Sequence, residues 1–177
     1  MNLQKINDEV FVAEDLIVRI GENEISFLKR QAHLSPRKRA RICAHKSNQD
    51  PLHEMLIAIS AKSYIHPHRH INKSESFHIL EGEVDVVVFD NHGDLKDVIK
   101  LGSRGSERSF YYRLSESAFH TLLIRSDILV MHEVTNGPFA RDGTVLAPFA
   151  PPEDQVDAVR AYMENLSNRV FQFPRMS

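Results

Sequence analysis

The stretch that decides the fold spans residues 64–82 and reads YIHPHRHINKSESFHILEG. Its histidines occupy alternate positions, at His66, His68 and His70. Alternate residues of a β-strand point to the same face, so the three imidazoles are predicted to share one side. Glu75 follows His70 after four residues, and Gly82 follows six residues later. Neutral imidazoles and a carboxylate on one face suit a divalent metal ion, and a glycine permits a tight turn.

This spacing matches the first sequence motif of the cupin superfamily, HxH(x)3–4E(x)6G, at His68, His70, Glu75 and Gly82. The second cupin motif, PxGxxH(x)3N, supplies one more histidine from a later strand. Residues 115–124 resemble it through His120, although serines replace the proline and the glycine, and Ile124 stands at the asparagine position.

The resemblance implies one divalent metal ion, which can be iron, manganese, nickel or zinc, in a small β-barrel. Its predicted ligands are His68, His70, Glu75 and His120. The alternative for the fourth ligand is His132. Three nitrogens and one carboxylate oxygen leave coordination positions open, which suits a catalytic metal better than a structural one.

The sequence from residue 52 onward supports the same fold class. Short runs rich in β-branched and aromatic residues alternate with turn-forming Gly, Asn, Asp and Ser. Seven segments are predicted as strands: Leu52–Ser60, Phe77–Leu80, Val84–Phe89, Val98–Leu101, Phe110–Arg113, His120–Ile124 and Ile128–Thr135. We therefore predict a mainly β protein with an antiparallel double-stranded β-helix, a jelly-roll barrel, over residues 52–147.

Two further segments flank the predicted barrel. Residues 1–51 are expected to form an N-terminal α/β extension, with short strands in 10–20 and a helix over Glu22–Ala32. Residues 148–177 are expected to form a C-terminal helix and tail. The helix is predicted over Asp154–Leu166, where an apolar stripe at helical spacing would pack on the barrel.

Composition limits the classes of partner. The 177 residues are 42% hydrophobic and 26% charged, with a net charge of -2, which fits one soluble domain. Neither nucleic acid nor membrane is expected as a partner, because no charge excess or long apolar run is present. The N-terminus lacks a secretory apolar region and Cys43 is the sole cysteine, so we expect a cytoplasmic protein without intrachain disulfides. A homodimer is compatible with the pattern.

The stretch 29–46 is basic and allows two main interpretations. It is either a solvated helix-and-loop face, or an arm that binds phosphate or carboxylate on a small ligand through Arg39, Arg41 and His45. Nucleic-acid binding is disfavoured because no aromatic residues interleave the basic ones. Lys73, between His70 and Glu75, is either a further substrate-binding residue or an exposed loop lysine.

Two residues are candidates for acid–base catalysis. His66 shares the parity of the predicted ligands and either lines the pocket or packs behind it. Glu133 and His132 are neighbours of opposite parity, so only one can face the pocket, and we favour Glu133 as a general base.

The chain is also similar to the WbuC family of cupin-fold metalloproteins. Four segments carry this resemblance: Pro36–Arg41 with His45, His66–His70 with Lys73 and Glu75, Phe89-Asp90 with Gly93, and His132–Phe139. The family is associated with bacterial surface-polysaccharide gene clusters, and its reaction is unassigned. The resemblance implies a metal-dependent enzyme acting on a sugar or sugar nucleotide by isomerase- or epimerase-type chemistry, with a small anionic or carbohydrate ligand. The alternatives are an iron-dependent dioxygenase and a non-catalytic ligand-binding or regulatory module.

Overall fold

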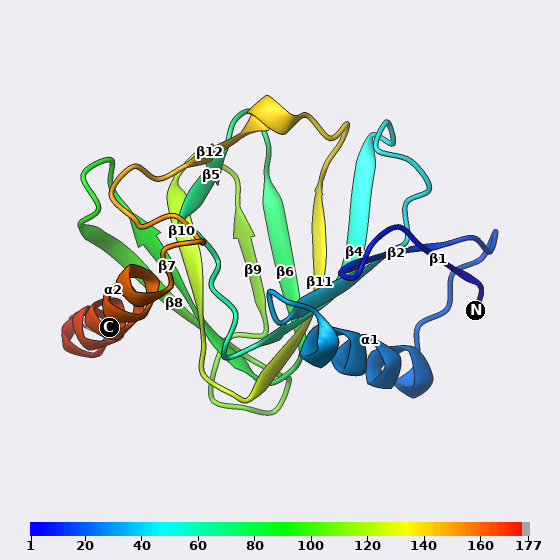
Figure 1. Cartoon of the computed structure of the whole chain (residues 1–177), viewed down its shortest axis with the longest axis horizontal. Coiled ribbons are helices and arrows are strands. Elements are labelled where there is room, and N and C mark those ends of the chain that lie inside the picture. Colours follow the sequence, from blue (N-terminus) through cyan, green and yellow to red (C-terminus); the bar gives the residue numbers. More distant parts are fainter. Residues whose placement is uncertain (175–177) are drawn as a thin grey trace.

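The computed structural model describes residues 1–174 and consists of two facing β-sheets with one helix against the outer side of each (Figure 1). The larger sheet has seven strands in the order β1-β2-β3-β4-β11-β6-β9. Their bounds are β1 Leu3–Lys5, β2 Val10–Ala13, β3 Arg39–Cys43, β4 Leu52–Ser60, β11 Ile128–Asn136, β6 Glu75–Glu81 and β9 Tyr111–Leu114. All of its pairs are antiparallel except β2–β3.

The smaller sheet has five antiparallel strands in the order β12-β5-β10-β7-β8. Their bounds are β12 Thr144–Leu146, β5 His68–His70, β10 Phe119–Ile124, β7 Glu83–Phe89 and β8 Leu95–Gly102. From β4 onward the chain alternates between the two sheets, apart from the β7–β8 hairpin, as in a double-stranded β-helix, and the predicted fold class is confirmed.

The barrel interior is filled by side chains from both sheets. On β7, Val84 and Val86 point inward and pack against Ile79 of β6 and Leu129 of β11. The intervening positions of β7 point outward and are also buried, because a helix covers them. Burial on both faces explains why β7 reads as a nearly continuous apolar run.

The two helices cover opposite sides of the molecule (Figure 1). Helix α1, Glu22–Leu34, packs Leu28 and Ala32 on the outer face of the larger sheet. Helix α2, Val156–Gln172, packs Leu166 and Val170 on the outer face of the smaller sheet. No helix in residues 1–174 is long and apolar enough to cross a membrane.

Part of the basic stretch lies in a strand, which the interpretation as a solvated helix-and-loop face did not anticipate. Residues 39–43 form a full strand, β3, inside the larger sheet rather than a solvated helix or loop. Ala40 and Ile42 pack beneath α1, while the alternate residues Arg39 and Arg41 face the other side of the sheet. The larger sheet therefore continues through the predicted boundary at residue 51.

One turn has the backbone that the sequence motif anticipates. Gly82 joins β6 to β7 with φ +83°, a left-handed conformation that favours glycine. A Cβ at this position would lie 2.4 Å from the backbone oxygen of Ile128. The glycine is therefore required both by its torsion angle and by the close approach of β11.

Candidate functional site

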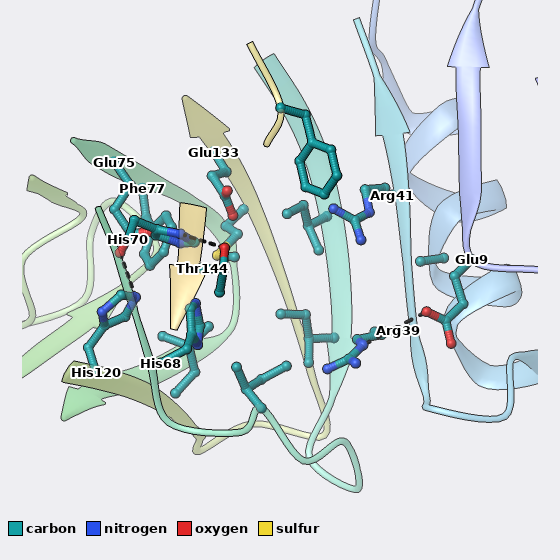
Figure 2. Close-up of a pocket in the computed structure, with 17 residues that line it drawn as sticks. Glu9, Arg39, Arg41, His68, His70, Glu75, Phe77, His120, Glu133 and Thr144 are labelled. Atoms are coloured by element: carbon teal, nitrogen blue, oxygen red, sulfur yellow. Dashed lines mark hydrogen bonds and ion pairs between the residues drawn. The ribbon is translucent and has the colours of Figure 1, made fainter. Parts of the chain in front are cut away.

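A cavity of about 270 Å³ lies between the two sheets. Figure 2 shows its two polar walls: histidines with Glu75 on one side, and Arg39 with Arg41 on the other. Apolar side chains of both sheets, including Ile57, Leu122 and Met131, line the space between these walls. The cavity is thus a mostly apolar space with polar groups at opposite ends, which is typical of a small-molecule site.

Three of the predicted ligands come from two paired strands of the smaller sheet. His68 and His70 lie on one face of β5, and His68 is directly opposite His120 in the register with β10. One ring nitrogen from each of the three lies within 4.8 Å of the others, which makes them a candidate metal site. Glu75, at the start of β6, approaches from the other sheet.

Glu75 contacts two of these imidazoles. Its Oε1 lies 2.9 Å from His120 Nε2, and its Oε2 lies 3.5 Å from His70 Nε2. Oε1 is fully buried and thus removed from water. A buried carboxylate oxygen in this state is costly unless a cation or a proton donor compensates it.

The other ring nitrogen of each histidine is already engaged. Nδ1 of His68 lies 2.8 Å from the carbonyl oxygen two residues earlier, and Nδ1 of His120 lies 3.0 Å from the equivalent carbonyl before it. Nδ1 of His70 lies 3.1 Å from Oγ1 of Thr144 on β12. Carbonyl oxygens only accept hydrogen bonds, so for His68 and His120 the proton resides on Nδ1 and Nε2 faces the site. The Thr144 hydroxyl can donate or accept, so it orients the His70 ring without fixing its tautomer.

The electrostatics of the site agree with this role. Burial, together with the nearby charge of His120, lowers the pKa of His68 to about 4, so this imidazole is neutral at neutral pH. Burial opposes the ionised form of Glu75, but the charge of His120 and hydrogen bonds from His120 and His70 lower its pKa overall. Burial also disfavours charge on His120, whereas Glu75 raises the His120 pKa above its ordinary value.

These residues fit a divalent metal. Without a metal, His120 and Glu75 can compensate each other as an imidazolium–carboxylate pair. A divalent ion could instead be held by these two groups together with His68 and His70, in which case the shared proton would be released. The structure thus brings together the four residues predicted as ligands. His132, the alternative, lies away from the cavity with Nε2 3.7 Å from Glu54 Oε1.

Glu133 lies on β11 and lines the same cavity as the histidines. Its carboxyl group has no hydrogen-bond or ion-pair partner among the side chains that the structure describes. Burial, reinforced by the negative charge of Glu75, raises the pKa of Glu133 to about 7. Glu133 thus provides a carboxyl group that exchanges a proton near neutral pH. His132, its neighbour of opposite parity, faces the outer side of the sheet, as the alternation requires.

The two arginines of β3 form the opposite wall (Figure 2). Arg39 donates to the carbonyl oxygen of Tyr64 at 3.1 Å and lies 3.3 Å from Glu153 Oε1. Its Nε is 3.9 Å from Oε2 of Glu9. Among the described residues, the Arg41 guanidinium group has one hydrogen-bond contact, with Met55 Sδ at 3.8 Å.

Three other residues proposed from sequence do not line the cavity. Nε2 of His66 lies 3.1 Å from the carbonyl oxygen of Ala147. The His45 ring stacks on the ring of His53 with centroids 4.0 Å apart. The Lys73 ammonium donates to the carbonyl oxygen of Pro138 at 3.0 Å and lines a separate polar hollow at the surface.

The sequence reasoning also missed two residues of the site. Thr144 holds His70, and Glu9 neutralises part of the arginine wall. Neither lies in a motif, and β12, which carries Thr144, has only three residues and no readable alternation. Their roles depend on tertiary packing and have no local sequence signal.

Comparisons with known proteins support the fold and assign no activity. A domain family of unknown function, DUF6016, matches residues 20–101, and no curated protein matches the chain. A crystal structure of a protein from Shewanella oneidensis is similar with a TM-score of 0.53 and 11% identity, covering 72% of this chain and 83% of that chain. At this identity the likeness shows a common fold alone.

Two other solved structures are less similar. An uncharacterized conserved protein with a double-stranded β-helix domain from Klebsiella pneumoniae has a TM-score of 0.48 and 13% identity, over 64% of this chain and 87% of that one. A protein from Thermus thermophilus, TT1209, has a TM-score of 0.46 and 24% identity, over 62% and 92%.

Proposed function

We propose that this protein is a metal-dependent cupin enzyme that moves a proton on a carbohydrate ligand, with isomerase- or epimerase-type chemistry. The observation that carries the proposal is the Glu133 carboxyl group. It has no partner within the described residues and faces the same cavity as the four candidate metal ligands. A metal held there would polarise a carbonyl or hydroxyl oxygen of the ligand and make a neighbouring C–H proton more acidic.

The chain's own residues would divide the work as follows. His68, His70, His120 and Glu75 hold the ion, and Thr144 keeps the His70 ring in orientation. Glu133 takes the proton from carbon and returns it. Its pKa of about 7 places it near neutrality, and a bound cation would lower that pKa toward the base form.

The size of the cavity restricts the ligand. The cavity volume of about 270 Å³ lies just below the usual range for small-molecule pockets, roughly 300–1,000 Å³. One sugar unit suits this volume, whereas the nucleotide part of a sugar nucleotide would have to extend beyond the mouth. The similarity of four segments to the WbuC family supports a role in bacterial surface-polysaccharide metabolism, where such ligands occur.

The test combines metal analysis with an exchange assay. Purified protein is analysed for metal and then incubated in D₂O with a panel of aldoses, ketoses and sugar acids, and NMR follows deuterium uptake at carbon. We expect about one metal ion per chain and deuterium uptake with at least one sugar. Glu133→Gln should keep the metal and lose the exchange, whereas Glu54→Gln, on the outer face of the sheet, should retain both.

Four outcomes would contradict the proposal. Wild-type protein that binds no metal would remove its basis. Exchange that survives in Glu133→Gln would exclude Glu133 as the base. Oxygen consumption with the iron-loaded protein, in the absence of exchange, would favour the dioxygenase, and metal binding with neither reaction would favour a non-catalytic module.

A further inference from the structure

The two arginines that enter the cavity from β3 differ in how their charges are compensated. Both lie on the same face of the strand, two residues apart, and both line the cavity. If they served the fold alone, both would be expected to have an acidic partner, because a partly buried cation without one is costly. The neighbours of Arg39 and Arg41 show that only one of them has such a partner.

Arg39 belongs to a closed ion-pair network at the back of the cavity. Glu9, whose side chain is only 9% exposed, accepts hydrogen bonds from Arg37 and lies near Arg39. Glu153 lies 3.6 Å from Arg37 and 3.3 Å from Arg39. The two guanidinium groups are thus matched by two carboxylates, and Arg39 also donates to Tyr64. The network leaves Arg39 little capacity to bind a ligand.

Arg41 has no such compensation. Across the described part of the chain, no carboxylate oxygen lies within 4.0 Å of its guanidinium nitrogens, and its one acceptor is the Met55 sulfur at 3.8 Å. A thioether is a weak acceptor, whereas a guanidinium group carries five donors. Arg41 is half-buried in the wall of the cavity, so an anion there would be held against a partly desolvated cation.

The histidine wall opposite Arg41 also favours binding of an anion in the cavity. A divalent ion bound by three neutral imidazoles and one carboxylate leaves a positive charge at that end, and Arg41 provides a second positive charge across the cavity (Figure 2). Glu133 lines the cavity as well, and its single negative charge when ionised would offset only one of these two positive charges. The electrostatic field of the loaded cavity therefore favours a negatively charged ligand.

From this asymmetry we propose that Arg41 is the anion-binding residue of the cavity and that the ligand is an acidic sugar or similar small hydroxy acid, whose carboxylate or phosphate pairs with Arg41 while its oxygens face the histidines. This inference rests on the proposed use of the cavity as a ligand site. It specifies that the ligand is charged, and it assigns Arg39 to positioning instead of ligand contact.

The test measures anion binding without requiring turnover. Zinc-loaded protein carrying ¹⁵N-labelled arginine is titrated with acetate and, separately, with inorganic phosphate, and NMR follows the Nε–H signals. Arg41→Gln and Arg39→Gln identify the two signals by their loss. We expect the Arg41 signal to move with a saturable dependence on one anion or both, while the Arg39 signal moves much less.

Calorimetry of the same titrations measures the affinity of each protein for the anion. A hydrogen-bonded charge pair contributes about 1.5–3 kcal/mol, so Arg41→Gln should weaken binding of the anion by roughly 10- to 100-fold. Arg30→Gln removes the same charge from the exposed side of α1 and should leave the affinity unchanged. Metal analysis of each variant excludes loss of zinc as the cause.

The outcomes distinguish a carboxylate ligand from a phosphate ligand, and they separate anion binding at Arg41 from the proposed enzyme activity. A response to acetate alone indicates a carboxylate ligand, and a response to phosphate alone indicates a sugar phosphate. No movement of the Arg41 signal with either anion, equal movement of both arginine signals, or unchanged affinity in Arg41→Gln would overturn the inference. Anion binding at Arg41 without deuterium exchange on any sugar would leave the inference standing while the proposed enzyme activity fails.

Discussion

Replacing Thr144 with valine tests how the metal site is built. The Thr144 hydroxyl lies 3.1 Å from Nδ1 of His70 and fixes which nitrogen of that ring points toward Glu75 and the other histidines. Valine has nearly the same shape but no hydroxyl, so the change removes the hydrogen bond and leaves the packing of β12 nearly intact. The affinity for the metal should fall because His70 loses its orientation and its hydrogen-bond partner at Nδ1.

The expected loss of metal affinity in Thr144→Val follows from the surroundings of His70. Loss of a residue that hydrogen-bonds to a metal-binding histidine typically weakens metal binding by about 10- to 100-fold, or roughly 1.4–2.7 kcal/mol. The His70 side chain is 24% exposed, so water can replace part of the lost hydrogen bond. We therefore expect the lower half of that range.

Competition between the protein and a chromophoric zinc chelator measures the affinity directly. Thr144→Ser restores the hydroxyl and should recover most of the binding. Thr135→Val provides a second control, because it removes a hydroxyl that donates to the Ser74 carbonyl, outside the ligand set. An affinity for Thr144→Val equal to that of wild type would refute the assigned role of this residue.

Further predictions concern the metal and the stability of the fold. His120→Ala should lose most bound metal by elemental analysis, and full retention would exclude it as a ligand. Without metal, the folded pKa of His68, about 4, lies below the unfolded value near 6.5, so this residue costs stability as pH falls from 6.5 to 4. Urea unfolding of the metal-free protein should show a smaller pH dependence over this interval in His68→Asn. Gly82→Ala should destabilise the fold by more than about 2 kcal/mol, because it combines positive φ with a close approach to a backbone oxygen, whereas Gly105→Ala has open space and pays for its torsion angle only. Equal urea midpoints for the two alanine variants would contradict this reasoning.

The barrel could be predicted from sequence because its signals are local. Most of the strands predicted after residue 52 lie within two residues of those observed, since β-branched runs and Gly or Asn turns mark their ends. The alternation at β5 likewise placed His68 and His70 on one face. For these elements, short-range pattern and tertiary structure agree.

The prediction for His66 illustrates where a local pattern ends. Its parity matches that of His68 only if the strand continues back through Pro67, but β5 begins at His68. Proline has no N–H to contribute to a strand ladder, and the chain before it follows another course that directs His66 to the Ala147 carbonyl. The alternation of side chains held for His68 and His70 within β5 and did not extend to His66, which precedes the strand.

The arginine wall required the full structure. Arg39 and Arg41 alternate with Ala40 and Ile42, which is a strand pattern, but five residues rich in charge resemble an exposed segment equally well. The difference between the two arginines depends on Glu9 and Glu153, which are 144 residues apart in the chain. Only tertiary contacts bring these carboxylates beside one arginine and leave the other without them.

The separation of the two polar walls also affects how such a protein can diversify. The three histidines belong to the smaller sheet, whereas both arginines belong to a strand added by the N-terminal segment to the larger one. On the proposed assignments, substitutions in β3 would change which ligand is accepted without disturbing the metal ligands on β5 and β10, and substitutions on those two strands would do the reverse. If the proposed roles hold, related barrels could change their ligand and keep their metal, because most residues of the two walls lie in different segments of the chain.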